Sequence, residues 1–224
     1  MEKREFMKVL IVCSGNYPEP IANFSIYKAY IYDQIEALRK YHNIQFDIYF
    51  IVGKGMMGYF SNIVKLRRRI KSNHYDLVHA HYSLSAIVSM ISSPIPVVIT
   101  FHGSDINIPI LNIISSCLSR LPKETIIVEQ NLYNKLLIKP RKKNIIPCGV
   151  DFDLFYPEPM ELCKKIEGLS LEKDYLLFSS SFARPVKNYS LCQAALSKLN
   201  TNVEILELKN KTRQQVRHLL NAVK

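Results

Sequence analysis

Two polar segments of this 224-residue chain each follow an apolar run that is typical of a buried strand. The first segment, His102-Gly103-Ser104-Asp105, comes directly after residues 97–101. Because the carboxyl ends of parallel strands meet at the crevice where α/β proteins bind ligands, we expect these side chains to line a site. His102 can donate to a sugar hydroxyl or a phosphate oxygen, and Gly103 lets the backbone approach a ligand closely. Asp105 can accept from ligand hydroxyls or cap the following helix, and both interpretations stay open.

The second polar segment carries two fixed positive charges. Arg184 and Lys187 follow the strand-like run at residues 175–180 and belong to one turn. Two cations in this arrangement can hold the diphosphate of a ligand. A solvated basic turn is the common alternative for any Arg-x-x-Lys. The pair therefore indicates a ligand site only together with the first segment.

A loop and a histidine pair are further candidates. Gly15 and Asn16 begin a loop without the Gly-x-Gly-x-x-Gly or Gly-x4-Gly-Lys pattern of phosphate-binding loops, so an ordinary turn and a ligand loop are equally open. His79 and His81 share one face of a strand because side chains alternate. No third ligand with suitable spacing accompanies them, so we expect no metal site. We expect His79 to pack in the sheet and His81 to line the crevice.

The net charge of +11 indicates an anionic partner. The basic residues are not interleaved with aromatic ones, and no nucleic-acid-binding motif is present, which argues against nucleic acid. The basic run at residues 65–71 lies beside an apolar stripe at helical spacing. Such a run is usually the solvated face of a packed helix, and contact with an anionic membrane surface is the sharper alternative.

Several features predict a cytoplasmic protein. The five cysteines are widely spaced, without a Cys-x-x-Cys pair, and favour reduced thiols. The amino terminus lacks the apolar length and the cleavage site of a secretion signal. The uncharged stretch at residues 82–101 has the length of a membrane span, but its serines, its prolines and its strand-like second half argue against one.

Strands and helices alternate along most of the chain. Apolar runs predict strands at residues 8–14, 45–52, 77–81, 97–101, 125–129, 144–147, 175–180 and 203–208. Periodicity predicts helices at residues 23–41, 59–73, 83–91, 107–120, 130–138 and 189–199, with a loop at 53–58 and a last helix after a capping box at Thr212. This order predicts an α/β fold with a parallel, Rossmann-like sheet that helices cover on both faces.

An irregular aromatic segment at residues 149–157 interrupts the alternation. We place the domain boundary in it, with one domain at residues 1–155 and a second at 156–224. The second domain has two expected strands, too few for an independent α/β domain. We therefore interpret it as the start of a second Rossmann-like domain that is cut short. An incomplete sheet of this kind would leave apolar residues unburied, namely Leu206, Leu208, Leu219 and Leu220.

Four segments, in this order and spacing, resemble glycosyltransferase family 4, whose members have the GT-B fold of two Rossmann-like domains. The segments are residues 76–81 (Asp-Leu-Val-His-Ala-His), 100–105 (Thr-Phe-His-Gly-Ser-Asp), 146–155 (Ile-Pro-Cys-Gly-Val-Asp-Phe-Asp-Leu-Phe) and 182–188 (Phe-Ala-Arg-Pro-Val-Lys-Asn). The resemblance implies a retaining transfer of a sugar from a nucleotide-sugar donor to a hydroxyl of a glycan or lipid-linked acceptor, with no cofactor and no metal ion. We expect a role in cell-surface polysaccharide or glycolipid synthesis at the inner face of the membrane.

The resemblance also implies roles for the candidate residues. Arg184 and Lys187 match the pair that neutralises the donor diphosphate, and His102 matches the histidine that approaches the donor sugar. Asp105 follows His102 in the cleft and is placed with it in the catalytic set. Further residues of the cleft on the acceptor side are Gly15, Asn16, His81, Gly103 and Asn107.

The chain departs from the family pattern in two places. The glycine pair of the loop after the first strand is absent, with Ala22-Asn23-Phe24 near that place, and the family's Glu-x7-Glu region would lie beyond residue 224. A catalytically inactive remnant or a binding module of the same fold is therefore the alternative to an enzyme. A nucleic-acid-binding α/β protein is a third hypothesis. Because a GT-B site needs both domains to close over the donor, we expect no transfer by residues 1–224 alone.

Overall fold

The computed structural model describes residues 6–199 and 202–224, with only the backbone of Met56. The chain divides into two compact units, Met1–Phe24 with Tyr30–Gly149, and Ser25–Ala29 with Val150–Lys224. This division falls at the start of the aromatic segment, whereas the sequence analysis places it at residue 155. The expectation about a secretion signal concerns in part residues 1–5, which lie outside the described residues.

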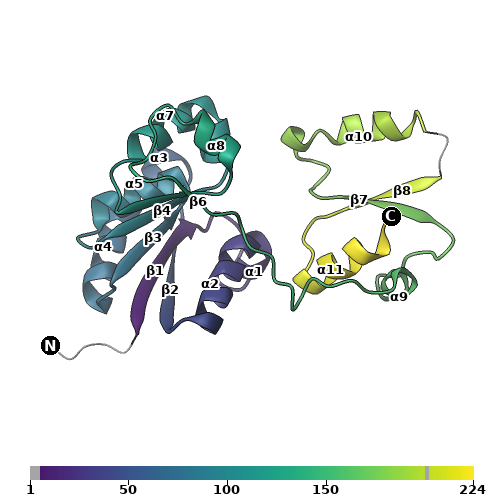
Figure 1. Ribbon diagram of the computed structural model, residues 1–224, viewed down its shortest axis with the longest axis horizontal. Coiled ribbons are helices and arrows are strands. Elements are labelled where there is room, and N and C mark those ends of the chain that lie inside the picture. Colours follow the sequence, from purple (N-terminus) through teal and green to yellow (C-terminus); the bar gives the residue numbers. More distant parts are fainter. Residues whose placement is uncertain (1–5, 200–201) are drawn as a thin grey trace. The chain divides into compact units, whose positions relative to one another are not determined.

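The first unit is built on a six-stranded parallel sheet of order β2-β1-β3-β4-β5-β6 (Figure 1). Its strands are β1 (Met7–Ser14), β2 (Ile44–Ile51), β3 (Leu77–His81), β4 (Val97–Phe101), β5 (Glu124–Ile127) and β6 (Asn144–Ile145). Leu10 and Val12 of β1 point into one apolar core, and Ile11 and Cys13 point into another on the opposite face. A central strand that is apolar on both faces is typical of a covered parallel sheet. The expected fold class is thus confirmed.

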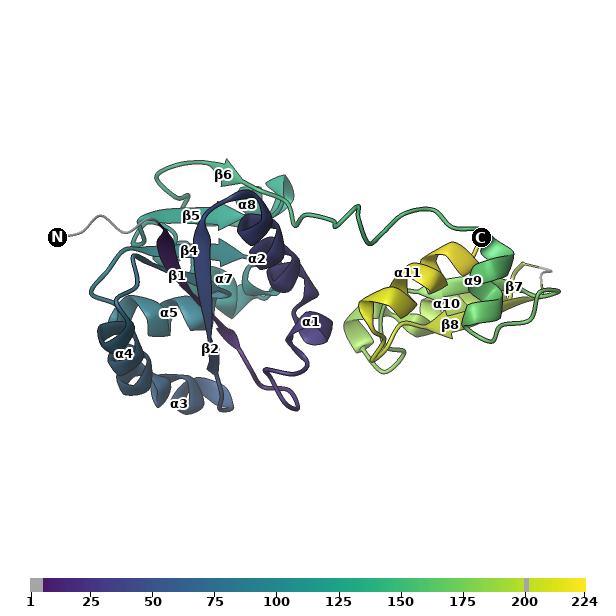
Figure 2. The ribbon, with the colours of Figure 1, turned by 90° about the horizontal axis from the view of Figure 1, so that it is seen from below.

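Helices cover both faces of this sheet (Figure 2). On one face α4 (Asn62–Asn73), α5 (Ser83–Ser92) and α7 (Pro109–Leu118) pack side by side, with α5 in the middle. On the other face α2 (Ala29–Tyr41) buries an apolar stripe against β1 and β2. None of the helices in the described part of the chain combines the length and the apolar character that a membrane span requires.

Residues 53–58 differ from the expected loop, since helix α3 (Gly55–Phe60) begins among them. A Cβ on Gly58 would lie 2.5 Å from the carbonyl carbon of Gly53. These glycines therefore permit a close approach of two backbone segments.

Two expected helices are interrupted. The helix expected at residues 23–41 consists of α1 (Phe24–Tyr27) and α2. The helix expected at residues 107–120 begins earlier, as α6 (Ser104–Asn107), and resumes as α7. The break at Ile108 has extended backbone, because a residue that precedes a proline disfavours the helical conformation.

The second unit has a two-stranded parallel sheet of β7 (Asp174–Phe178) and β8 (Val203–Glu207). Its helices are α9 (Met160–Ile166), α10 (Tyr189–Leu196) and α11 (Arg213–Ala222), of which the sequence analysis misses α9. The capping box at the start of α11 is confirmed, since the N–H of Gln215 donates to Thr212 Oγ1 at 3.3 Å and the N–H of Thr212 donates to Gln215 Oε1 at 3.0 Å.

Helix α11 buries more of its apolar face than expected. Leu219 is only 4% exposed, because α11 packs on α9, whereas Leu220 is 53% exposed. The expectation for Leu219 was therefore wrong, and that for Leu220 is confirmed. Helix α10, in contrast, has no buried residue.

Candidate functional site

Three imidazole rings stack at the carboxyl ends of β3 and β4, on the face of the sheet that α2 covers. The rings of His79 and His81 lie 4.4 Å apart, and those of His81 and His102 lie 5.2 Å apart. His81 Nδ1 and His102 Nε2 are separated by 2.9 Å, which is a hydrogen bond whose direction depends on the tautomers. The parallel register brings the last residue of β3 beside the end of β4, and this is why two residues far apart in sequence meet.

The innermost ring belongs to His79, which packs in the sheet as expected. Its Nε2 lies 2.8 Å from Thr100 Oγ1. Burial, together with the neighbouring His102, lowers the pKa of His79 to about 4. His79 is therefore neutral at physiological pH. Thr100 and Phe101 are both buried and serve packing.

His102 is the outer, half-buried member of the stack. His81 is only 1% exposed, so its side chain does not present a surface to a ligand in this conformation. It packs against the buried side of the His102 ring. On its other side His102 meets the ring of Tyr30 from α2, with 4.6 Å between the centroids.

Tyr30 is a residue of the site that the sequence analysis misses. In sequence it is one apolar position on a helix, and no local signal marks it. Burial raises the pKa of the Tyr30 phenol, and Cys13, Cys148 and Asp105 add to this shift. The phenol therefore stays protonated and can donate a hydrogen bond next to His102.

Asp105 holds the turn between β4 and α6. Its side chain is fully buried, and Oδ1 accepts from the N–H groups of His102 at 3.0 Å and Gly103 at 2.9 Å. Gly103, and not Asp105, occupies the N-cap position of α6. Asp105 thus turns back onto the preceding backbone and does not cap the helix.

The carboxylate of Asp105 should make folding stability depend on pH. Burial raises its pKa from 3.8 to about 6, against the opposing effect of the backbone hydrogen bonds. The folded protein then binds this proton more tightly than the unfolded chain does, so the free energy of unfolding falls as the pH rises from 3.8 to about 6. We expect a loss of up to about 3 kcal/mol over this window.

Denaturant unfolding of two variants checks this expectation. Asp105→Asn keeps an Oδ1 that can accept from both N–H groups but does not titrate, so its stability should be flatter with pH than that of the wild type. Asp105→Ala leaves both N–H groups without their acceptor and should lose about 1–3 kcal/mol at every pH. Identical pH profiles for the wild type and Asp105→Asn would show that another group is responsible.

Gly103 and Asn107 complete this turn. Gly103 has φ 122° and ψ −61°, a conformation that side-chain-bearing residues rarely adopt. Its carbonyl accepts from the N–H groups of Ile106 and Asn107. Asn107 is exposed, and its Oδ1 accepts from Lys135 Nζ at 2.6 Å. Among the candidates near His102, Asn107 is the one whose side chain is open to solvent.

Gly15 and Asn16, in the loop after β1, each contact the region where β2 ends. A Cβ on the buried Gly15 would lie 2.7 Å from the Cβ of Phe50, so packing alone demands glycine there. The Asn16 amide donates to the carbonyl of Gly53 at 2.9 Å and accepts from its N–H at 2.8 Å. This pair of hydrogen bonds ties the loop after β1 to the loop after β2.

Arg184 and Lys187 lie, as expected, on one turn directly after β7. Arg184 precedes a short 3₁₀ helix, Pro185–Lys187, and both side chains are exposed. Neither side chain forms an ion pair with another residue in the described part of the chain. Two cations of one turn that no carboxylate of the described residues neutralises are available to an anion.

The basic turn is anchored from β8 by Glu207, which the sequence analysis misses. Its Oε1 accepts from Ser181 Oγ and from the N–H of Phe182, both at 2.8 Å. These two hydrogen bonds lower the pKa of Glu207, and the one from Ser181 has the larger effect. Phe182 in turn stacks on Tyr189 with 3.8 Å between the ring centroids. The turn is therefore fixed although its two cations are exposed.

A family model for glycosyltransferase family 4 matches residues 8–154, which is most of the first unit. The chain belongs to glycosyltransferase family 4. A comparison with curated protein sequences gave no match.

Several solved structures superpose on most of this chain. Sucrose-phosphate synthase from Thermosynechococcus elongatus superposes with a TM-score of 0.59 at 12% identity, over 97% of this chain and 74% of that one. HepE from Anabaena, in complex with UDP-glucose, gives 0.58 at 16% identity over 97% and 72%. A glycosyltransferase from Rickettsia africae gives 0.54 at 15% identity over 98% and 72%. At these identities the likeness establishes the GT-B fold.

Proposed function

We propose that the protein is a retaining glycosyltransferase that moves a sugar from a nucleotide-diphosphate donor to a hydroxyl of a glycan or lipid-linked acceptor. The observation that carries this proposal is the anchored turn with the exposed cations Arg184 and Lys187. HepE, which shares the fold, was solved with UDP-glucose, and this supports a donor of the same chemical class. Cell-surface polysaccharide or glycolipid synthesis is the process that we propose for it.

The two cations fit the charge that develops during transfer. The bond between the anomeric carbon and the diphosphate oxygen breaks, and a bond from the acceptor oxygen to the same carbon forms. Negative charge grows on the departing nucleoside diphosphate, where positive side chains stabilise it most. The leaving phosphate can take the acceptor's proton, so the reaction requires neither a strong protein base nor a metal ion.

The residues of the first unit have supporting roles in this proposal. His102 contacts the donor sugar, and Asn107 offers an exposed amide to a sugar hydroxyl. Asp105 and Gly103 act through the turn that sets the position of His102. His81 orients His102, and Gly15 and Asn16 shape the loop on the acceptor side.

Nucleotide binding by the 224-residue chain, together with turnover by a protein that carries a complete second domain, tests the proposal. Isothermal titration with nucleoside diphosphates reports whether the basic turn binds the leaving group, and isotope-labelled nucleotide sugars report transfer. Binding with turnover supports the enzyme. Binding without turnover in the presence of acceptor would favour a binding module of the same fold, and the absence of both would contradict the proposal.

We further propose that the protein works on the cytoplasmic side of a membrane and contacts anionic lipids. As expected, the basic residues of α4 are exposed, and so is Val64 among them. The exposed cations are Lys65, Arg67, Arg68, Arg69 and Lys71. Of these Arg69 lies 3.6 Å from Asp47, which leaves a net positive surface for lipid phosphates.

A further inference from the structure

Helix α7 follows only in part the usual rule for a surface helix, which buries apolar residues and exposes polar ones. Leu118 and Ile114 pack toward the core, but serines are buried beside them while other apolar residues stay exposed. Ser115 and Ser116 of α7 and the adjacent Ser119 are buried. On the solvent side Ile110 is 63% exposed, Ile113 is 50% exposed, and Cys117 is exposed as well. No charged residue occurs in this helix.

The buried serines have defined partners, so this orientation is built into the fold. Ser115 Oγ donates to the carbonyl of Asp105 at 2.7 Å. Ser116 Oγ accepts from the N–H of Leu137 at 2.9 Å, and Ser119 Oγ donates to the carbonyl of Ile138 at 2.9 Å. These bonds hold the segment after α8 (Gln130–Lys135) along α7.

The same bonds leave the side chains of this segment exposed, with Leu137 at 70% and Ile138 at 41%. Leu121, just past the end of α7, is 63% exposed. We call this surface the apolar platform, which consists of Ile110, Ile113, Cys117, Leu121, Leu137 and Ile138.

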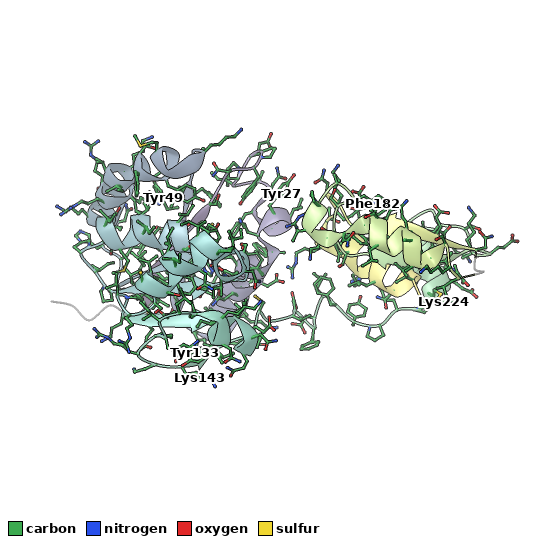
Figure 3. The ribbon with its side chains drawn as sticks, turned by 90° about the horizontal axis from the view of Figure 1, so that it is seen from above. Tyr27, Tyr49, Tyr133, Lys143, Phe182 and Lys224 are labelled. Atoms are coloured by element: carbon green, nitrogen blue, oxygen red, sulfur yellow. The ribbon has the colours of Figure 1, made fainter. Side chains whose placement is uncertain are left out.

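Basic residues accompany the apolar platform. They are exposed and follow its members closely in sequence, namely Arg120, Lys123, Arg141, Lys142 and Lys143. Arg120 Nε donates to the carbonyl of Lys139 at 3.0 Å, and Lys143 Nζ lies 5.4 Å from the centroid of the Tyr133 ring (Figure 3). Only Lys142 of these five forms an ion pair within the described residues, with Glu124. The basic helix α4 covers the same face of the sheet as α7.

We propose that the apolar platform enters the interfacial region of a bilayer that contains anionic lipids. Contiguous exposed apolar side chains on a soluble fold mark an interaction surface. A cationic border fits anionic head groups, while apolar residues between them gain from burial at the acyl boundary. Two copies of the chain would bring like charges together, which disfavours self-association through this surface.

This inference deepens the proposed membrane contact, on which it rests, and is independent of sugar transfer. It assigns most of the apolar part of the contact to α7 and residues 137–138, whereas α4 supplies mainly charge. The distinction can be measured, because loss of apolar burial and loss of charge respond differently to salt.

A single tryptophan gives the direct test, since the chain has none. Ile113→Trp places the probe on the platform, and Tyr41→Trp places a matched one on α2, where Tyr41 is 70% exposed on the opposite face of the sheet. With phosphatidylcholine–phosphatidylglycerol vesicles we expect a blue shift and quenching by brominated lipid for Ile113→Trp only. With pure phosphatidylcholine we expect neither.

Co-sedimentation with the same vesicles gives the magnitude. Ile110→Ser combined with Ile113→Ser should weaken binding roughly tenfold or more, because two large apolar side chains leave the interface. Tyr41→Ser is the matched control and should bind like the wild type. Arg67→Gln combined with Arg68→Gln should weaken binding at low salt. At high salt, where the charges are screened, this variant and the wild type should bind alike.

The outcomes separate the inference from the proposals it rests on. Binding that depends on Arg67 and Arg68 but not on Ile110 and Ile113 would keep the membrane contact and overturn the platform. No vesicle binding at all would overturn both, and transfer to a soluble acceptor would still report on catalysis. A blue-shifted Ile113→Trp spectrum without vesicles would show that polypeptide covers the platform, which also overturns the inference.

Discussion

In a protein that carries a complete second domain, replacing Arg184 or Lys187 by alanine will lower the rate of sugar transfer by roughly two to three orders of magnitude. Each side chain would stabilise charge on the departing diphosphate, and this charge is greatest in the transition state. Because both side chains are exposed and free of ion pairs with the described residues, their removal should leave the thermal unfolding temperature nearly unchanged. Initial rates with isotope-labelled nucleotide sugar measure the effect.

Lys198→Ala is the matched control, since Lys198 is an exposed cation of the same unit just beyond α10. It should leave both turnover and diphosphate binding unchanged. Equal rates for wild type, Arg184→Ala and Lys187→Ala would sink the assignment of a diphosphate site to this turn. A general decline in all three variants would point instead to the net charge of the unit.

Removing the hydrogen bond between His81 and His102 should cost roughly 10²-fold in kcat, because a small misplacement of a contacting side chain has that effect. His81→Phe preserves much of the ring volume in a site that is only 1% exposed but lacks the nitrogen. His81→Asn places a side-chain nitrogen or oxygen near the position of Nδ1. We therefore expect His81→Asn to recover a large part of the activity that His81→Phe loses.

An NMR measurement on the wild type separates orientation from stability. A nitrogen–nitrogen scalar coupling between His81 Nδ1 and His102 Nε2, which are 2.9 Å apart, would demonstrate the hydrogen bond itself. The coupling should vanish in His81→Phe, while the free energy of unfolding is followed in parallel. Equal activities of His81→Phe and the wild type, or no coupling in the wild type, would contradict the positioning role.

Much of the first unit could be read from the chain because its signals are local. The strands at residues 77–81 and 97–101 agree with β3 and β4 to the residue. A short apolar run bounded by polar residues is itself the condition for a buried parallel strand. The turn with Arg184 and Lys187 and the capping box of α11 were predictable for the same reason, since neighbouring residues form them.

The site required contacts between distant residues. The His81–His102 bond joins residues 21 apart, and Tyr30 reaches His102 from a helix on the covering layer. The sequence left two roles open for Asp105, because a carboxylate can cap a helix or bind a ligand. Only the folded turn shows that it accepts from the backbone N–H groups of His102 and Gly103.

Orientation was likewise decided by packing. Periodicity identified the helix that includes α7, but the rule that apolar residues face inward would turn Ile110 and Ile113 to the core, and both are exposed. Hydrogen bonds from Ser115 and Ser119 to backbone carbonyls turn the serines inward instead. In the same way the pairing of α11 with α9 buries Leu219, and a close backbone approach explains Gly53 and Gly58. The sequence by itself determined which segments are strands and helices and which turns carry charge, because those depend on neighbours. The tertiary structure alone decided which side chains meet and which faces stay exposed, because partners distant in the chain satisfy the buried polar groups.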